Sequence, residues 1–102
     1  MDLRAFWTDT ARFQLEEIFD YYKDKANLKV ARKLVNKIID RTIQLEKHPS
    51  SGQREPLLAN RKFDYRYLVE SNYKIIYWIE DNYIKIASVF DCRQNSRKIK
   101  DL

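Results

Sequence analysis

The groups in this chain that could carry chemistry are mainly basic, and many of them gather near its end. The strand-like run "YIKIASVF" leads into Asp91 and Cys92, and the composition then changes to guanidinium, amide and ammonium groups: Arg93, Gln94, Asn95, Ser96, Arg97 and Lys98. A guanidinium can hold a phosphate through two hydrogen bonds and stabilise the charge that develops on it. Arg93 is therefore a candidate phosphate ligand.

Proton transfer is harder to assign than phosphate binding. Cleavage of RNA through its 2′-hydroxyl needs one group to accept a proton and another to donate one. The single histidine, His48, precedes Pro49 at the predicted end of a helix, where capping and the helix dipole account for it. Gln94 and Asn95 can form hydrogen bonds but cannot exchange protons. The single cysteine, Cys92, has no neighbouring histidine to activate it, so we interpret it as structural.

Length and composition limit the class of protein. A chain of 102 residues has room for one modest core, and we assign residues 1–102 to a single domain. Apolar residues make up 44% and aromatic residues 14%, which is too much for a disordered chain. The sequence has neither metal-ligand spacing nor a glycine-rich phosphate loop, so we expect no cofactor and no metal.

The charge is unevenly distributed, and the net charge of +5 favours an anionic partner. The stretch 9–25 carries five acidic and three basic residues, a net of −2. The stretch 28–48 carries six basic and two acidic residues, a net of +4, and the stretch 92–102 has a net of +3. If the fold brings the two basic segments together, they form one positive patch.

The sequence also bears on location. Asp2 and Arg4 interrupt any apolar stretch at the start of the chain, and the longest apolar run, Ile75 to Ile79, is far too short to span a bilayer. A single cysteine fits a reducing compartment. We therefore expect a cytoplasmic protein with no membrane partner.

The first half of the chain predicts a short strand and two helices. Leu3 to Trp7 is a strand candidate, and three possible helix N-caps follow at positions 8–10. Asn27 can cap a second helix, which should end at His48. Apolar residues recur every three or four positions in each segment, as in amphipathic helices: Ala11, Leu15, Ile18 and Tyr22, then Ala31, Leu34, Val35, Ile38, Thr42 and Leu45. The junction between these two helices is so short that they should form an antiparallel hairpin.

After Asn60 the pattern becomes that of strands. The segments "FDYRYLVE", "YKIIYWIE" and "NYIKIASVFD" are rich in residues that fit a pleated sheet, and Ser71-Asn72 and Asp81-Asn82 separate them as tight turns. We predict a three-stranded antiparallel meander whose middle strand, Tyr73 to Glu80, is covered on both faces. The fold class is α+β, with an N-terminal strand, a helical hairpin and then the meander.

Several segments resemble the RelE/ParE superfamily of bacterial toxins. "FWTDTARFQLEEIFDYY" is similar to the family's aromatic-rich first helix, and "HPSSGQREPLL" resembles its loop after the second helix. "YRYLVESNYKIIYWIEDNYIKIASVFDCRQN" resembles its strand block, in which an arginine precedes a short turn and the last strand ends in arginine. The resemblance covers nearly the whole chain and implies a small twisted sheet packed on a helical hairpin.

The resemblance implies a toxin of a type II toxin–antitoxin pair, silenced by a cognate antitoxin. Two targets are known in the superfamily: ParE-like members poison DNA gyrase without known catalytic residues, and RelE-like members cut messenger RNA in the ribosome. We favour the ParE-like branch, because no acid–base pair can be assembled. The alternatives are a ribosome-dependent endonuclease and a non-toxic binding module with the same fold.

The resemblance also assigns roles to individual residues. In the nuclease alternative Arg66 and Arg93 are the catalytic residues, and we expect them to project toward one shallow concavity, with Lys74 adding charge. The expected target or nucleic-acid contacts are Arg61, Lys62, Arg97 and Lys98. Some nucleases of the superfamily use lysines, arginines and a C-terminal tyrosine, but the chain has no tyrosine after Arg93.

Overall fold

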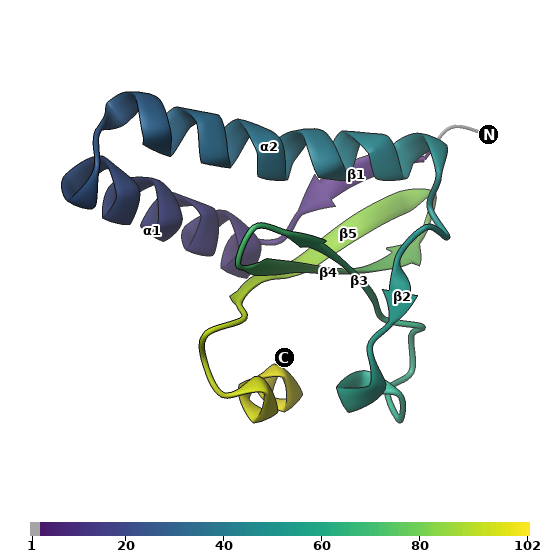
Figure 1. Ribbon diagram of the computed structural model, residues 1–102. Helices are drawn as coiled ribbons and strands as arrows, with labels where there is room; N and C mark the ends of the chain where they lie inside the picture. Colours follow the sequence, from purple (N-terminus) through teal and green to yellow (C-terminus); the bar gives the residue numbers. More distant parts are fainter. Residues whose placement is uncertain (1–2) are drawn as a thin grey trace.

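The predicted helical hairpin is confirmed by the computed structural model, which describes residues 3–102. Helix α1 (Asp9–Lys25) begins after Thr8, whose side chain accepts a hydrogen bond from the N–H of Ala11. Helix α2 (Leu28–Lys47) begins after Asn27, whose side chain caps it in the same way, and ends at His48. The two helices lie side by side and cover one face of a sheet (Figure 1). Within residues 3–102, neither helix has the length and hydropathy needed to cross a bilayer.

The sheet contains the predicted meander and two further strands at its edges. Its order is β1 (Arg4–Trp7), β5 (Tyr83–Asp91), β4 (Tyr73–Glu80), β3 (Arg66–Glu70) and β2 (Gln53–Arg54). Neighbouring strands are antiparallel except for β1, which pairs in parallel with β5. The sequence had predicted the strand at β1 but not its partner, and it had predicted a loop where β2 forms.

The turns of the meander are tight because their residues adopt the left-handed backbone region. Ser71 lies between β3 and β4 with a φ of 54°, and Asp81 and Asn82 lie between β4 and β5 with φ of 52° and 65°. Asparagine and aspartate tolerate this region better than most residues. The turns therefore fix the register in which Arg66 pairs with Tyr77 and Asp91 pairs with Tyr73.

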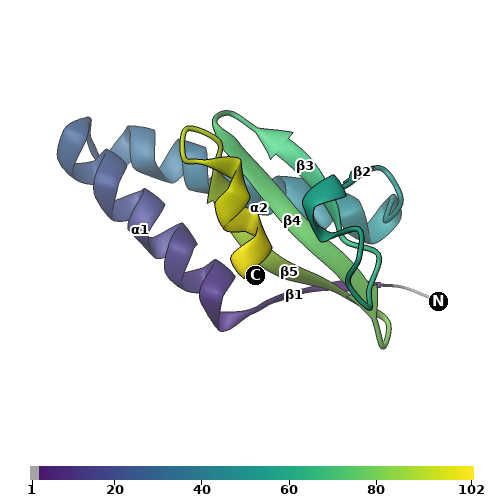
Figure 2. The ribbon, with the colours of Figure 1, turned by 90° about the horizontal axis from the view of Figure 1, so that it is seen from below.

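Both faces of the middle strand are covered, as predicted. On the helix side, Tyr73, Ile75 and Tyr77 join the main core with residues from both helices. On the opposite side, two short 3-10 helices, η1 (Pro56–Leu58) and η2 (Ser96–Asp101), pack over the sheet (Figure 2). A second cluster forms beneath them from Leu58, Ile76, Phe90 and Ile99.

The basic end of the chain is therefore ordered. Ile99 is fully buried, while its basic neighbours Lys98 and Lys100 stay exposed. The side chain of Arg61 donates hydrogen bonds to the carbonyls of Lys100 and Leu102 and fastens the tail to the loop after η1. One buried isoleucine thus anchors the charged cluster that follows β5.

Candidate functional site

Arg66 is bound to its own surroundings. Its guanidinium donates a hydrogen bond of 2.9 Å to the carbonyl of Gly52 and forms an ion pair of 3.3 Å with Asp64. The side chain is 23% exposed, so only part of it faces solvent. Tyr77 ties down the same loop, because its hydroxyl donates to the carbonyl of Pro49 and accepts from the N–H of Gly52. Arg66 thus holds the 49–52 segment against the sheet.

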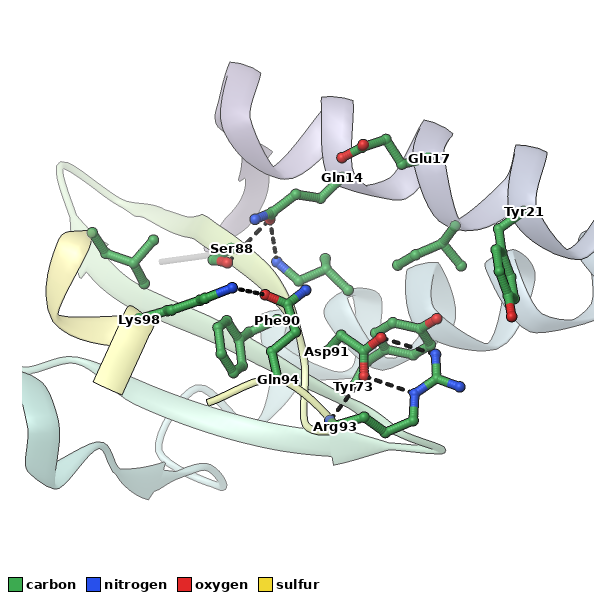
Figure 3. Close-up of a pocket in the computed structure, with 13 residues that line it drawn as sticks. Gln14, Glu17, Tyr21, Tyr73, Ser88, Phe90, Asp91, Arg93, Gln94 and Lys98 are labelled. Carbon is green, nitrogen blue, oxygen red and sulfur yellow. Dashed lines mark hydrogen bonds and ion pairs between the residues drawn. The ribbon is translucent and has the colours of Figure 1, made fainter. Parts of the chain in front are cut away.

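Arg93 is also paired with a carboxylate. Its Nη2 lies 2.8 Å from Oδ2 of Asp91, and its Nε and backbone N–H both donate to Oδ1 of Asp91. Figure 3 shows this two-pronged pairing. The Arg93 side chain stays 52% exposed. A phosphate that bound Arg93 would have to compete with the carboxylate of Asp91.

The structure does not bring the two arginines together. Arg66 pairs in register with Tyr77, whereas Asp91, which holds Arg93, pairs with Tyr73. These two positions are four residues apart along β4, or about 13 Å at the rise of a strand, and β3 and β5 flank β4 on opposite sides. The expected shared concavity is therefore absent from the described residues.

Lys74 lies on the opposite face of the sheet from Tyr77, because side chains alternate between faces along a strand and the two residues are three positions apart on β4. Arg66 pairs with Tyr77 and shares its face. Its Nζ forms a 3.0 Å ion pair with Glu55, whose side chain is fully buried, and lies 4.2 Å from the centre of the Tyr67 ring. The side chain of Glu55 also accepts a hydrogen bond from the N–H of Leu57 and caps η1. Lys74 therefore joins β4 to η1 and adds no charge beside Arg66.

The other basic candidates differ in whether their side chains already have partners within the protein. Arg61 is bound to the tail carbonyls, and Lys62 lies over the ring of Phe63 at 5.5 Å. Arg97 and Lys98 are exposed on η2, and Lys98 makes only a long 3.5 Å hydrogen bond to Gln94. Arg97 and Lys98 are thus the sequence-predicted residues best placed to meet a partner.

A cleft of about 520 Å³ lies between α1, the end of β5 and the tail. Figure 3 shows its lining: Gln14, Glu17 and Tyr21 from α1 face Tyr73, Asp91, Arg93, Gln94 and Lys98. Gln14 bridges the two sides, because its Oε1 accepts hydrogen bonds from the Ser88 hydroxyl and the Val89 N–H. The cleft is the place where the acidic first helix and the basic tail meet.

Proton affinities in the cleft are shifted away from neutral pH. Hydrogen bonding from Arg93 holds the pKa of Asp91 below its ordinary value. Burial, reinforced by a hydrogen bond with Tyr22, raises the pKa of Tyr73 well above its ordinary value. Asp91 therefore stays ionised and Tyr73 stays protonated at neutral pH. A general acid or base works best with a pKa near the working pH, so neither group is suited to proton transfer.

His48 and Cys92 remain apart from this cleft. His48 caps α2 and lines a different hollow with Arg41 and Lys47. Desolvation raises the pKa of the Cys92 thiol, although the residue is exposed, and this disfavours the reactive thiolate. Among residues 3–102, no group of three histidine, cysteine, aspartate or glutamate side chains is placed to hold a metal ion.

Sequence reasoning missed the contribution of α1 to the cleft. Gln14 lies three residues after Ala11 and four before Ile18, on the stripe that faces the sheet. A polar residue at such a position usually has a buried partner, and this signal could have identified it. Glu17 and Tyr21 follow Gln14 by one and two turns of the helix, so one anchored glutamine places all three at the cleft.

The chain was compared with protein families, solved structures and individually curated proteins, and the first two comparisons gave matches. The family model described as "ParE toxin of type II toxin-antitoxin system, parDE" matches residues 5–96. A solved structure described as "Chromosomal ParDE TA system from P. aeruginosa" has a TM-score of 0.70 and 22% identity, covering 89% of this chain and 95% of that chain. No individually curated protein matches the chain. The family match spans most of the sequence, and the structural likeness supports the fold.

Proposed function

Because the chain belongs to the ParE family of toxins of type II toxin–antitoxin systems, we propose that it arrests growth by binding DNA gyrase in the cytoplasm. A toxin of this type acts with an antitoxin that neutralises it, so a cognate antitoxin is a partner of the chain. The choice of gyrase rests on the ParE-like branch of the superfamily, whose members poison gyrase without a known catalytic site. The chain's own residues must then support binding without chemistry.

The proposal rests on the ion pairs of the two arginines and on the pKa values of the groups in the cleft that Arg93 lines. Arg66 and Arg93 are each neutralised by a carboxylate and lie on opposite sides of β4. Asp91 and Tyr73 have pKa values displaced from neutrality in opposite directions. RNA cleavage needs a phosphate clamp beside groups that exchange protons near neutral pH, and this arrangement lacks that combination among the described residues.

The tail is the surface that we assign to the target. Arg97 and Lys98 are exposed on η2, and the buried side chain of Ile99 holds that helix rigidly against the sheet. Exposed cations on an anchored helix can steer and bind an acidic surface without rearranging. An antitoxin that covers η2 and the adjoining cleft would block this contact, which gives a direct route to neutralisation.

The experiment is induction of the toxin in cells while DNA replication and translation are followed separately. We expect DNA damage and filamentation, with translation continuing at first and messenger RNA intact. A rapid fall in translation with cut transcripts would instead assign the chain to the nuclease branch. Healthy growth without the antitoxin would show that the chain is a binding module of the same fold.

Two sets of variants test which surface of the molecule is responsible for toxicity. Arg97→Ala with Lys98→Ala should weaken toxicity by about one order of magnitude or more, because each loses a charge-assisted contact to the target. Arg93→Ala should leave toxicity nearly unchanged, because its guanidinium is already occupied by Asp91. Loss of toxicity in the Arg93 variant alone, with folding intact, would favour the nuclease reading and count against a gyrase contact on the tail.

A further inference from the structure

The side chain of Arg41 on α2 has a buried hydrogen-bond donor without an acceptor in the protein. Its Nε is a buried side-chain nitrogen with no hydrogen-bond partner, and no other such atom is found within residues 3–102. Buried donors are nearly always paired with protein, water or ligand. Arg41 lines a cleft of about 500 Å³ between the end of α2 and β3, together with Gln44, Lys47, His48, Ser51 and Leu68.

The charges around this cleft have one sign. Among the described residues, no carboxylate lies within ion-pair distance of Arg41, Lys47 or His48. This differs from the environments of Arg66 and Arg93, which are both paired.

The acidic residues closest in sequence or along β3 do not line the cleft at Arg41, although Glu70 lies beside a second hollow farther along α2, because its partner Ser71 lines that hollow. Glu46 accepts a hydrogen bond from the N–H of Ala5, and Glu70 accepts one from the hydroxyl of Ser71. Asp40 is exposed on α2. The positive charge of the cleft therefore remains available to an external anion.

The basic surface continues along the helix. Lys33 and Lys37 line a second hollow with Ser71, which follows β3, so they lie on the same side of α2 as Arg41. Lys33, Lys37 and Arg41 are spaced four residues apart, about 6 Å of rise for each step. Together with Lys47 and His48 they form a row of basic residues beside β3, which we call the α2–β3 groove: Lys33, Lys37, Arg41, Lys47 and His48.

We propose that the α2–β3 groove binds the phosphate backbone of nucleic acid. Guanidinium and ammonium groups contact phosphate oxygens, as can the hydroxyl of Ser51 beside them, and a row of such groups suits a ligand that carries a phosphate at every step. A docked protein segment would need apolar anchors. Within residues 3–102, Leu68 is the one apolar residue that lines the cleft at Arg41, and the hollow at Lys33 and Lys37 adds Tyr22, Val30 and Leu34. The row of basic residues, and not a lack of apolar contacts, therefore favours a polyanion. The site is separate from the tail that we assign to gyrase, so either assignment can fail without the other.

The test measures binding of a short labelled DNA duplex to the purified chain by fluorescence anisotropy across a series of salt concentrations. The logarithm of the binding constant falls with the logarithm of salt by about 0.9 for each phosphate contact. Replacing two contacting residues, Arg41→Gln with Lys47→Gln, should reduce this slope by about 1.8 and weaken binding at least about tenfold at low salt.

The control keeps the change in net charge but moves it off the groove. Arg4→Gln with Arg32→Gln removes two exposed cations, one on β1 and one on the far side of α2 from Arg41, that line neither hollow, and the slope should stay within experimental error of the unmodified chain. If the Arg41 variant loses stability, Lys37→Gln with Lys47→Gln provides an exposed pair for the same measurement.

Equal losses in the groove and control variants would overturn the proposal, since diffuse charge would then explain binding. Unchanged DNA binding in the groove variants would overturn it as well. If those variants keep DNA binding but no longer co-purify with the antitoxin, the groove belongs to an acidic protein partner and not to nucleic acid. None of these outcomes depends on whether gyrase is the target.

Discussion

Tyr77 shows how a residue of the strand block holds the loop that precedes it. Its side chain is fully buried in the main core, yet its hydroxyl reaches the carbonyl of Pro49 at 2.8 Å and the N–H of Gly52 at 3.0 Å. The Gly52 backbone passes so close that an added Cβ would lie 2.5 Å from this hydroxyl. The chain's one glycine is therefore required by packing against Tyr77, and Arg66 completes the joint through the Gly52 carbonyl.

Tyr77→Phe should destabilise the protein by about 1–3 kcal/mol, because it leaves the buried N–H of Gly52 and the partly buried carbonyl of Pro49 without their partner. Urea unfolding followed by circular dichroism measures the change. Tyr83→Phe is the matched control, since the Tyr83 side chain is 43% exposed and its hydroxyl makes no hydrogen bond among the described residues. Equal stability of the Tyr77→Phe variant and the unmodified chain would show that the joint contributes nothing.

Asp91 should make the stability of the fold depend on pH in acid. Its pKa is lowered in the folded state by Arg93, so the stabilisation is fully present above the ordinary aspartate pKa of about 3.9 and is lost as the pH falls through the lower folded value. Arg93→Gln should remove this component. The difference in urea midpoint between the two proteins should be constant near neutral pH and shrink below about pH 4; a difference that grew in acid would contradict the assignment.

At the level of single residues, the sequence indicated types but not partners. Arg66 and Arg93 are recognisable as phosphate-binding candidates from residue type and from the resemblance to the toxin superfamily. Their engagement by Asp64 and Asp91 depends on side-chain directions that a strand pattern does not specify. The sequence also contained no sign of the unpaired Nε of Arg41, because an arginine on the charged side of a helix pattern is normally solvated.

At the level of elements, periodicity predicted the long units well. The helices were recognisable because their apolar stripes continue over several turns and their caps, Thr8 and Asn27, are polar residues at the correct positions. The meander was recognisable from its two turns. The two-residue strand β2 and the 3-10 helices η1 and η2 are too short to show a period, and the parallel pairing of β1 with β5 is set by tertiary packing.

Helix η2 depends on one apolar residue. Ile99 is fully buried against Leu58, Ile76 and Phe90, so Ile99→Ala should lower the unfolding free energy by about 2–5 kcal/mol. Lys100→Ala, at the neighbouring exposed position, should change it by about 0.5 kcal/mol or less. Thermal or urea unfolding of the two variants tests this. Similar small effects in both would mean that η2 is not packed on the sheet as described.

At the scale of the whole molecule, charge and packing are arranged on separate surfaces. The acidic helix α1 meets the tail at the cleft of Figure 3, while Lys33, Lys37, Arg41 and Lys47 of α2 lie beside β3. The two basic segments predicted from sequence thus form two surfaces and not one patch. This separation allows a toxin to contact its target through the tail and a polyanion through the α2–β3 groove.

The central claim is that this ParE-family toxin acts on gyrase by binding and does not cut RNA. The most direct measurement adds the purified toxin to purified gyrase, DNA and ATP, and follows supercoiling and trapped double-strand breaks, with the cognate antitoxin as control. We predict inhibited supercoiling and accumulated breaks that the antitoxin prevents and that Arg97→Ala with Lys98→Ala reduces. Gyrase that supercoils normally at every toxin concentration, while the same preparation cleaves messenger RNA on ribosomes, would contradict the account.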